Sequence, residues 1–524
     1  MRCVAVALVA LLALAAAPAD ALRALMVFPF AAHSHNTMFK GMAEALVDRG
    51  HEVVMFSPFP RSKPRANYTD ISTASGESLV GSVDFDKLTP VTVDVPALVP
   101  YMYIKAIHEM GGDHLCRQVF SMPELQKALA GGYGRFDVVF TEAFASDCWA
   151  AIPHALQLPA ISLASGPDWP WIHERMGSVD NPSYIINVFT TFKDPMSFWD
   201  RLRNTVFATS INYFFQSKLQ DGSDAVVREF FGDNVPPLRE LVKNTSLLLL
   251  NRHESINAAR PTPPNIVHVG GLHIAPPPGT LDADLRSWMD GAEHGVIFFS
   301  LGSMLKAASM PTQMRDTLVE TFRRIPQRVV WKFEADIPNL PDNVRISKWL
   351  PQMDILTHPK TVLFITHGGL MGTLESLHCG VPMMGIPLFA DQGVNMDMYR
   401  GLGIAESIDR FNMDVDTTVA TIKKLLDGGG YLKRAREMSA AFKDRPQQAA
   451  DQAVWWTEYV VRHRGAHHLR PSSVRLPLYQ YLLLDVIAFL VLCSAVAATL
   501  VWVALVAVVR RLSRVAASTK AKKA

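Results

Sequence analysis

The chain has 524 residues, of which 49% are hydrophobic and 19% are charged. A chain of this length is too long to fold around one hydrophobic core, so we expect two lobes. The formal net charge is only +2, and the absence of a single-sign field argues against nucleic acid or an acidic polymer as a partner.

Residues 1–21 have the three parts of a secretory signal peptide. Arg2 precedes an apolar run that extends through Ala17, and Ala19-Asp20-Ala21 forms a cleavage site of the A-x-A kind. The alternative is an N-terminal strand or helix. We expect cleavage here, so that the mature chain begins near Leu22.

Strand-like and helical patterns alternate through residues 22–260, which predicts a lobe with a parallel sheet covered by helices. A strand at 23–30 leads to a helix with Met38, Met42 and Leu46 on one face, and a second strand follows at 53–56. The pattern recurs as a strand at 137–140, a helix at 146–156 and a strand at 160–163.

Proline and glycine are dense between residues 261 and 281, which predicts an interdomain linker. Residues 282–440 then form a second lobe, with strands expected at 296–301, 328–333, 344–347, 362–366 and 383–386 and helices starting at Gln313 and Gly372. A return segment, 441–478, carries a helix at 450–462 that we expect to cross back onto the first lobe. The predicted fold class is α/β, with two doubly wound Rossmann-like lobes.

A continuous apolar run from Leu482 to Val509 contains one charge, Asp485. Because a helix of roughly 20 residues spans a bilayer, residues 479–509 are predicted to be transmembrane. The tail, 510–524, is basic and lacks acidic residues, so the positive-inside rule places it in the cytosol and both lobes in the lumen.

The last residues, Lys520-Ala521-Lys522-Lys523-Ala524, resemble a dilysine retrieval signal. The alternative is a solvated basic tail that meets anionic headgroups. We expect a type I protein of the endoplasmic reticulum membrane. Sequons at Asn67 and Asn244 fit a lumenal location.

The cysteines argue against a disulfide framework. Cys3 leaves with the signal peptide and Cys493 lies in the predicted membrane span, so that Cys116, Cys148 and Cys379 remain. This is an odd number, although an oxidising lumen permits one bridge.

The most informative segment lies between residues 349 and 392. It reads Trp349-Leu350-Pro351-Gln352, Phe364-Ile365-Thr366-His367-Gly368-Gly369, Gly372-Thr373-Leu374-Glu375-Ser376, Gly380-Val381-Pro382-Met383 and Pro387-Leu388-Phe389-Ala390-Asp391-Gln392. This resembles the signature of the UDP-glycosyltransferase family, whose members have a two-lobed GT-B fold, and the chain most resembles arthropod members. The resemblance implies inverting, metal-independent transfer of a hexose from a UDP-sugar to a small lipophilic acceptor.

The same residues have a direct physical reading. His367 and two glycines stand where a strand gives way to a helix, and a helix start offers free N–H groups and a positive dipole to an anion. We expect a diphosphate there, with Gly368 and Gly369 allowing close approach and the amides of Gly372 and Thr373 donating to it. A plain β–α turn would explain the glycines but not His367.

The resemblance also implies roles for individual donor-binding residues. Trp349 would stack on uracil, Gln352 would reach the ribose or base edge, and Glu375 would accept from the ribose hydroxyls. Asp391 and Gln392 would contact the sugar, and Ser303 the diphosphate. Many relatives carry asparagine where this chain has Met371, so that one polar contact to the donor is absent.

His35, just after the first strand, matches the family's general base. An imidazole suits that role because it titrates near neutrality. His33 is a near competitor. In much of the family an aspartate after the corresponding strand orients the base, and Glu142 stands at that place here. The resemblance therefore implies Glu142 as the orienting carboxylate, with Asp147 as the rival. No metal site and no cofactor are expected, since the UDP-sugar is a cosubstrate and the Asp-x-Asp pairs read as solvated loops. Those pairs are Asp84/Asp86, Asp282/Asp284 and Asp414/Asp416.

UDP-glucose is the favoured donor, with UDP-glucuronate second. Aromatic residues of the first lobe are expected to line the acceptor pocket, although they could equally belong to the hydrophobic core. They are Tyr101, Tyr103, Trp169, Trp171, Phe189, Phe192, Phe198, Trp199, Phe214 and Phe215. The expected partners are therefore the donor, the acceptor and the lipid bilayer, with a homo-oligomer left open. The competing interpretations are a catalytically silent, membrane-tethered binder of lipophilic ligands and a nucleotide-sugar epimerase.

Overall fold

The computed structural model of the chain describes residues 21–74, 80–88, 99–166, 168–190, 192, 194–277 and 279–521. The predicted signal peptide therefore lies almost wholly outside the described residues, as do Lys522 and Lys523 of the predicted retrieval signal. The chain divides into two compact units, residues 1–470 and residues 471–524.

The first lobe is built on a seven-stranded sheet in the order β3-β2-β1-β4-β5-β6-β7, with every neighbouring pair parallel. The strands are β1 (Arg23–Val27), β2 (Glu52–Ser57), β3 (Tyr68–Ser72), β4 (Val138–Glu142), β5 (Ala160–Ala164), β6 (Thr245–Leu250) and β7 (Ile266–His268). β7 falls inside the predicted linker, because Ile266 and Val267 bury their side chains against the sheet despite the surrounding prolines.

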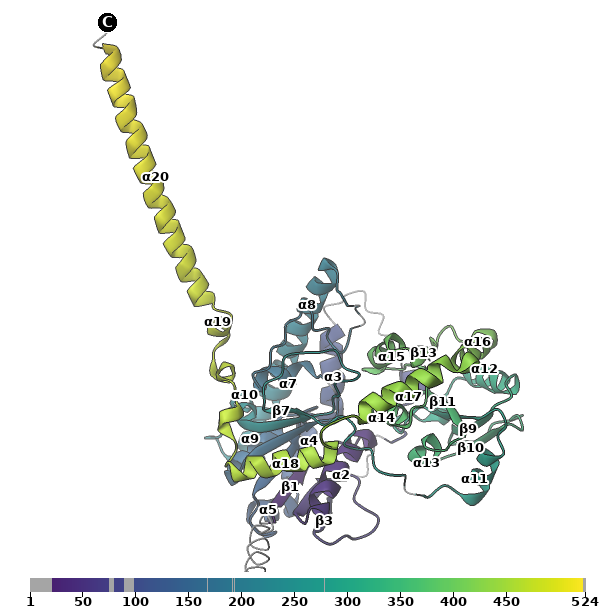
Figure 1. Cartoon of the computed structure of the whole chain (residues 1–524). Coiled ribbons are helices and arrows are strands. Elements are labelled where there is room, and N and C mark those ends of the chain that lie inside the picture. The colour runs from purple at the N-terminus through teal and green to yellow at the C-terminus, as the bar shows by residue number, and fades with distance from the viewer. Residues whose placement is uncertain are drawn as a thin grey trace, which may run out of the picture. The chain divides into compact units, whose positions relative to one another are not determined.

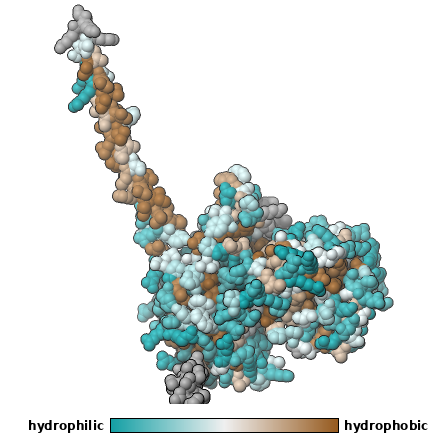
Figure 2. Space-filling model, in the orientation of Figure 1, coloured by the Kyte–Doolittle hydropathy of each residue, from teal (hydrophilic) through white to brown (hydrophobic). Residues whose placement is uncertain are grey.

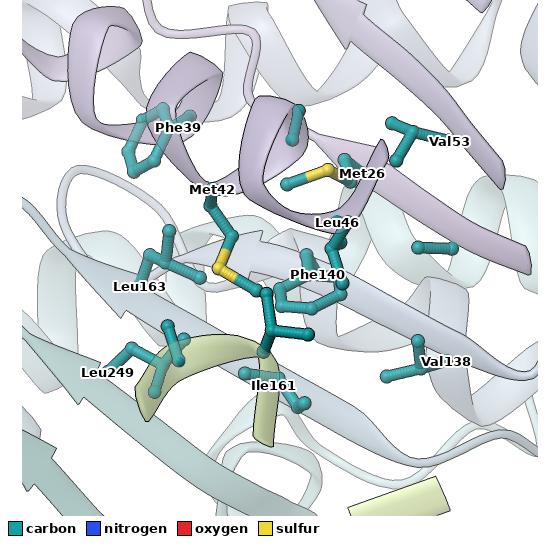
Figure 3. Packing of buried hydrophobic residues seen from close by; sticks show 14 of the residues in the cluster. Met26, Phe39, Met42, Leu46, Val53, Val138, Phe140, Ile161, Leu163 and Leu249 are labelled. Atoms are coloured by element: carbon teal, nitrogen blue, oxygen red, sulfur yellow. The ribbon is translucent and has the colours of Figure 1, made fainter. Parts of the chain in front are cut away.

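Helices cover this sheet on both faces (Figure 1). They are α2 (His33–Asp48), α3 (Val99–Gly111), α4 (Asp113–Phe120), α5 (Pro123–Leu129), α6 (Ala151–Leu156), α7 (Pro170–Arg175), α8 (Phe198–Phe214), α9 (Asp221–Phe231) and α10 (Leu238–Leu241). Figure 3 shows how Met42 and Leu46 of α2 pack on Phe140 and Ile161 of the central strands. This contact buries the predicted apolar face of α2.

The second lobe has a six-stranded sheet in the order β10-β9-β8-β11-β12-β13, again wholly parallel. The strands are β8 (Val296–Ser300), β9 (Arg328–Lys332), β10 (Val344–Ser347), β11 (Thr361–Thr366), β12 (Met383–Gly385) and β13 (Ala405–Ser407). Its helices are α11 (Ala283–Asp290), α12 (Thr312–Arg323), α13 (Gln352–Leu356), α14 (Leu370–Cys379), α15 (Gln392–Gly401), α16 (Val415–Leu426) and α17 (Gly430–Lys443). The prediction of two doubly wound lobes is confirmed.

The helix α18 (Ala449–Arg462) packs on the first lobe. Ala453, Val454 and Val460 of α18 are buried in the same core as Met42 of α2. A segment of the first lobe likewise packs on the second lobe. Phe85 is buried in the core of the second lobe, and Val83 forms a parallel β-bridge with Leu305. Chain order alone therefore does not separate the two lobes.

One disulfide joins Cys116 and Cys148, which agrees with the single bridge that the sequence permits. Among the described residues, Cys379 and Cys493 are free. Both predicted glycosylation sites, Asn67 and Asn244, are exposed.

The second unit contains α19 (Leu478–Tyr481) and α20 (Leu484–Ala521). The stretch Leu484–Thr519 of α20 is long and apolar enough to cross a membrane, and its apolar side chains are conspicuous in Figure 2. The helix does not end at Val509. It continues through Arg510, Arg511 and Arg514, so the first part of the predicted basic tail is helical.

Candidate functional site

Each sheet reverses its strand order at one point, between β1 and β4 in the first lobe and between β8 and β11 in the second. Ligands of open α/β sheets bind outside the carboxyl ends of the strands at such a point. His35 follows β1 and Glu142 ends β4, whereas Ser303 follows β8 and His367 follows β11. The predicted site residues of both lobes therefore come from the switch points of their sheets.

His35 and Glu142 are in direct contact. The Nδ1 atom of His35 lies 2.5 Å from Oε1 of Glu142, and the two side chains are 15% and 3% exposed. His35 is in the first turn of α2 rather than in the loop before it, which fixes its direction relative to β4. A buried carboxylate at Nδ1 leaves Nε2 as the nitrogen that can accept a proton.

Asp147 is engaged elsewhere. Arg175 donates from Nη1 and Nη2 to the two carboxylate oxygens of Asp147, at 2.6 and 2.8 Å, and Gln220 donates to Oδ2 at 2.7 Å. All three side chains are buried. Of the two carboxylates that the sequence left open, the structure therefore brings Glu142, and not Asp147, to His35.

Ser165 is a further polar residue at this site, which the sequence did not single out. Its Oγ lies 2.9 Å from His35 Nδ1 and 3.5 Å from Glu142 Oε1, at the end of β5. Its backbone carbonyl accepts from Nδ2 of Asn251 at 2.9 Å. The position after the β5 strand is the one signal in the sequence that could have identified it.

In the second lobe, His367 is held between two glycines. A Cβ atom on Gly302 would lie 2.7 Å from Cε1 of the imidazole, and one on Gly369 would lie 2.5 Å from Nε2. Burial, helped by the charge of Lys332, lowers the pKa of His367 to about 4. The ring is therefore neutral at pH 7, and its buried Nδ1 has no hydrogen-bond partner within the described part of the chain.

The helix after His367 begins earlier than predicted, at Leu370 with Gly369 as its N-cap. The amide of Thr373 donates to Gly369 O at 3.1 Å inside this helix, and the Thr373 hydroxyl donates to Leu370 O at 2.9 Å. The expectation that the Thr373 amide serves a phosphate is therefore wrong. The first helical amides, from Leu370 to Gly372, are the ones that an α-helix leaves without internal partners.

Glu375 and Gln352 are in direct contact. Gln352 Nε2 donates to Glu375 Oε2 at 2.5 Å, and Gly372 makes room for this amide, since a Cβ there would approach it to 3.2 Å. Burial raises the pKa of Glu375 to about 7. The carboxyl group is thus poised to change its charge near neutral pH.

Trp349 is 57% exposed, which leaves its ring open for a stacked base. His33 meets this ring edge to face at 5.5 Å between centroids, so His33 lies against the predicted base platform rather than against Glu142. Lys332 stands at the end of β9 with its Nζ 6.0 Å from the Trp349 centroid. The sequence did not identify Lys332, although a lysine that ends a strand beside the switch point is a recognisable signal.

Asp391 and Gln392 precede and begin α15. Asn395 donates to Asp391 Oδ2 at 2.9 Å. Burial raises the pKa of Asp391, and this hydrogen bond opposes the shift. Gln392 Oε1 accepts from the amides of Leu388 and Phe389, so its carbonyl shapes the preceding loop. The ring contact between His33 and Trp349 brings residues of both lobes together at this site.

Met371 occupies the position at which the sequence departs from the family pattern. Its carbonyl accepts from Nε2 of His273 at 3.1 Å, and Asn251 Nδ2 lies 3.5 Å from its sulfur. Its side chain packs against the core of the first lobe. Met371 therefore joins the lobes where asparagine would offer an amide.

The Asp-x-Asp pairs have structural roles where they are described. Asp282 and Asp414 are helix N-caps that accept from Leu285 N and Thr417 N. Their partners Asp284 and Asp416 form ion pairs with Arg345 and Arg324, while Asp86 is an exposed residue.

The predicted aromatic residues separate into three groups. Rings run in contact from His35 through Phe144 and Trp169 to Phe189 and Tyr103, with centroids 4.6–5.8 Å apart. Trp171 and Phe215 stack in the core, whereas Phe198 and Trp199 are exposed on α8. Trp171 also stacks on Trp169 at 5.8 Å, so the second group joins the series that leads to His35, whereas Phe198 and Trp199 do not.

Comparison with known proteins gives a consistent result. Residues 23–519 match the family model described as UDP-glucoronosyl and UDP-glucosyl transferase. The chain is 37% identical to UDP-glucosyltransferase 2 of Dactylopius coccus over 469 residues, which cover 89% of each protein. It is 34% identical to UDP-glucuronosyltransferase 2B7 of Rattus norvegicus over 477 residues, covering 88% of this chain and 89% of the relative.

Among solved structures, the glycosyltransferase SnogD from Streptomyces nogalater is similar with a TM-score of 0.56 at 19% identity. The match covers 84% of this chain and all of SnogD. A UDP-glucosyltransferase from Polygonum tinctorium matches with a TM-score of 0.54 at 15% identity, covering 84% of this chain and 99% of that one. These likenesses confirm the two-lobed GT-B fold.

Proposed function

Because this chain belongs to the UDP-glycosyltransferase family and is therefore a glycosyltransferase enzyme, we propose that it transfers glucose from UDP-glucose to a hydroxyl group of a small lipophilic acceptor. The contact between His35 and Glu142 at the switch point of the first lobe carries this proposal. A carboxyl group and an imidazole held in contact in a buried position are expected at a site of proton transfer.

In the proposed mechanism, Glu142 accepts a hydrogen bond from Nδ1–H of His35, so that Nε2 is the nitrogen that can accept a proton. His35 Nε2 takes the proton of the acceptor hydroxyl while its oxygen forms a bond to the anomeric carbon. The bond from that carbon to the diphosphate oxygen breaks on the opposite face, and UDP leaves with the electron pair. The anomeric configuration inverts, and the carboxylate of Glu142 stabilises the imidazolium that forms.

The second lobe supplies the groups that would stabilise the leaving diphosphate. The first amides of α14 and its positive dipole face the switch point, with His367 as a neutral donor and Lys332 as a cation near it. Glu375, Trp349 and Asp391 would hold the ribose, the base and the hexose. This set favours leaving-group stabilisation by protein groups, without a metal.

An apolar aromatic acceptor fits the rings that lead from His35 through Phe144 and Trp169 to Phe189. Flat rings offer large contact areas to a planar ligand at little entropic cost. UDP-glucose is favoured over UDP-glucuronate because the Dactylopius relative at 37% identity is named a glucosyltransferase, whereas the rat glucuronosyltransferase is 34% identical.

We further propose that α20 anchors the protein in the endoplasmic reticulum membrane with both lobes in the lumen. The arginines that follow its apolar run favour this orientation by the positive-inside rule. The disulfide between Cys116 and Cys148 suits an oxidising lumen.

The test compares UDP-glucose, UDP-glucuronate and UDP-galactose with one generic phenol, using full-length protein in sealed microsomes. We expect β-glucoside formation from UDP-glucose that requires permeabilisation of the membrane. His35→Ala is the negative control and should still bind UDP. Binding of the phenol without turnover of any donor would favour the catalytically silent binder instead.

A further inference from the structure

The helix α8 has one face buried against its lobe and an exposed apolar face on the other side. Asn204 and Ile211 point inward and are buried, and Asn204 bonds to Pro182 O and Ile185 O. On the other side, Phe198, Trp199 and Tyr213 are 61%, 64% and 64% exposed. Large aromatic side chains so open to solvent are unusual on a monomer.

The exposed apolar residues form one stripe. At 100° per residue, Phe198, Trp199, Leu202, Val206 and Tyr213 fall within an arc of about 100° opposite the buried face. We define these five residues as the α8 stripe. Thr209 is the one exposed polar residue of α8 within this arc.

The residues that flank the α8 stripe are cationic. Arg201 lies on one side of the arc and Arg203 on the other, and both are exposed. The acidic residue of this turn, Asp200, points away and closes the capping box with Ser197. An apolar stripe between arginines is typical of a helix that lies in a membrane interface, with the guanidinium groups at the level of the lipid phosphates.

We propose that the α8 stripe is a second membrane contact, which inserts into the interfacial region of the bilayer. The aromatic composition fits that region, where tryptophan and tyrosine concentrate. This inference rests on the proposed anchoring by α20, because residues 471–483 separate the lobes from that helix and reach no more than about 45 Å. Such a tether keeps the stripe at a high effective concentration near lipid.

The position of α8 gives this contact a role in acceptor capture. The helix packs against α3, through Phe214 and Tyr101 among others, with ring centroids 5.4 Å apart. Tyr103 of α3 stands at the outer end of the aromatic series that leads to His35. A lipophilic acceptor dissolved in the bilayer would therefore leave it beside the start of its binding path. In Figure 1, α8 rises beyond the sheet of its lobe.

The experiment uses full-length protein in nanodiscs of phosphatidylcholine and phosphatidylserine, with one copy per disc. Cys379→Ser and Cys493→Ser remove the free thiols and leave the disulfide. Single cysteines then carry a spin label at Leu202→Cys or Val206→Cys on the stripe, at Val496→Cys in α20, and at exposed Gln313→Cys in α12 as the matched control. Collision with oxygen and with a soluble nickel complex measures immersion.

We expect the labels at positions 202 and 206 to collide more with oxygen than with the nickel complex, like the label at position 496. The label at position 313 should collide more with the nickel complex. Nickel-accessible labels at 202 and 206 with an immersed 496 would overturn the stripe proposal alone. Nickel access at all these positions would overturn the anchor as well. Protection from both reagents, with spin–spin broadening when two copies share a disc, would instead make the stripe an interface between copies and overturn the proposal.

A kinetic test separates acceptor capture from general damage. Leu202→Glu with Val206→Glu should raise KM several-fold for a long-chain phenol that partitions into lipid, with kcat and the KM of a water-soluble phenol unchanged. Gln313→Glu, at the exposed control position on α12, is the control. Equal changes for both phenols, or none, would remove the role in acceptor capture.

Discussion

The Nδ1 atom of His35 and the Oε1 atom of Glu142 are 2.5 Å apart, although 107 positions separate the two residues in sequence. The neighbouring carboxylate of Asp147 is bound by Arg175 through both of its oxygens. One carboxylate thus faces the proposed base and the other is part of a buried ion pair.

This division predicts opposite consequences for two amide substitutions. Glu142→Gln should lower kcat by about 10³–10⁴-fold, with little change in KM, because the wrong tautomer of His35 is favoured. Asp147→Asn should leave an unpaired buried arginine and lower the free energy of unfolding by about 3–5 kcal/mol. Steady-state kinetics and thermal unfolding of both variants measure this. If Asp147→Asn instead folded stably and lowered kcat as much as is expected for Glu142→Gln, the orienting role would belong to Asp147.

Ser165 should act as a positioning residue for His35. Because its hydroxyl lies beside Nδ1 and Glu142, Ser165→Ala should lower kcat by about tenfold, the effect of about one hydrogen bond. Unlike a general loss of structure, the change should shift the pH–rate profile and be rescued by Ser165→Thr. A lower melting temperature with an unshifted profile would indicate a packing role.

Ionisation of the buried Glu375 carboxyl group should lower the free energy of unfolding. Since burial raises its pKa from 4.5 to about 7, the folded state holds this proton more tightly than the unfolded state. Its contribution to stability therefore falls as the pH rises from 4.5 to 7, by up to about 3 kcal/mol. Glu375→Gln should stabilise the protein at pH 8 but not at pH 4.5, as chemical denaturation would show.

Donor affinity should depend on the same carboxyl group. Ribose hydroxyls donate best to an ionised carboxylate, so UDP should bind the wild-type protein more tightly at pH 8 than at pH 6. Calorimetry at the two pH values checks this, with Glu375→Gln as the control that should bind weakly at both. Affinity that is equal at both pH values in the wild type would contradict the ribose assignment.

His367 should depend on the space that Gly302 leaves for it. Gly302 and Gly428 both have positive φ, 82° and 68°, but a Cβ meets His367 only at Gly302, while Gly428 faces open space. Each alanine variant should lose roughly 1–2 kcal/mol of stability to backbone strain. Only Gly302→Ala should also weaken UDP binding, by about the 1.5–3 kcal/mol of a hydrogen bond to a charged group. Equal UDP affinity in both variants would place His367 away from the diphosphate.

Chelation tests the proposed leaving-group stabilisation. Protein groups are assigned to the diphosphate, so the transfer rate should be unchanged after treatment with EDTA. Loss of activity that returns with Mg²⁺ or Mn²⁺ would show instead that a divalent cation binds with the donor.

The sequence alone determined the features that local chemistry specifies. Hydrophobic periodicity predicted both doubly wound lobes, and the run of apolar residues before Arg510 predicted α20. The motif from Trp349 to Gln392 predicted the donor site and its family. Each of these depends on residues that are neighbours in the chain, so no knowledge of distant contacts was needed.

Tertiary structure decided what depends on distant partners. Arg175 binds Asp147, which leaves Glu142 for His35, and only the ion pair between α7 and the loop after β4 reveals this. Ser165 and Lys332 reach the site because parallel strands end at one edge of each sheet. The helix that begins at Leu370 takes the Thr373 amide into its own ladder, and β7 forms within a proline-rich stretch because the sheet edge offers partners. Side-chain direction and long-range pairing, rather than local preference, settle such choices.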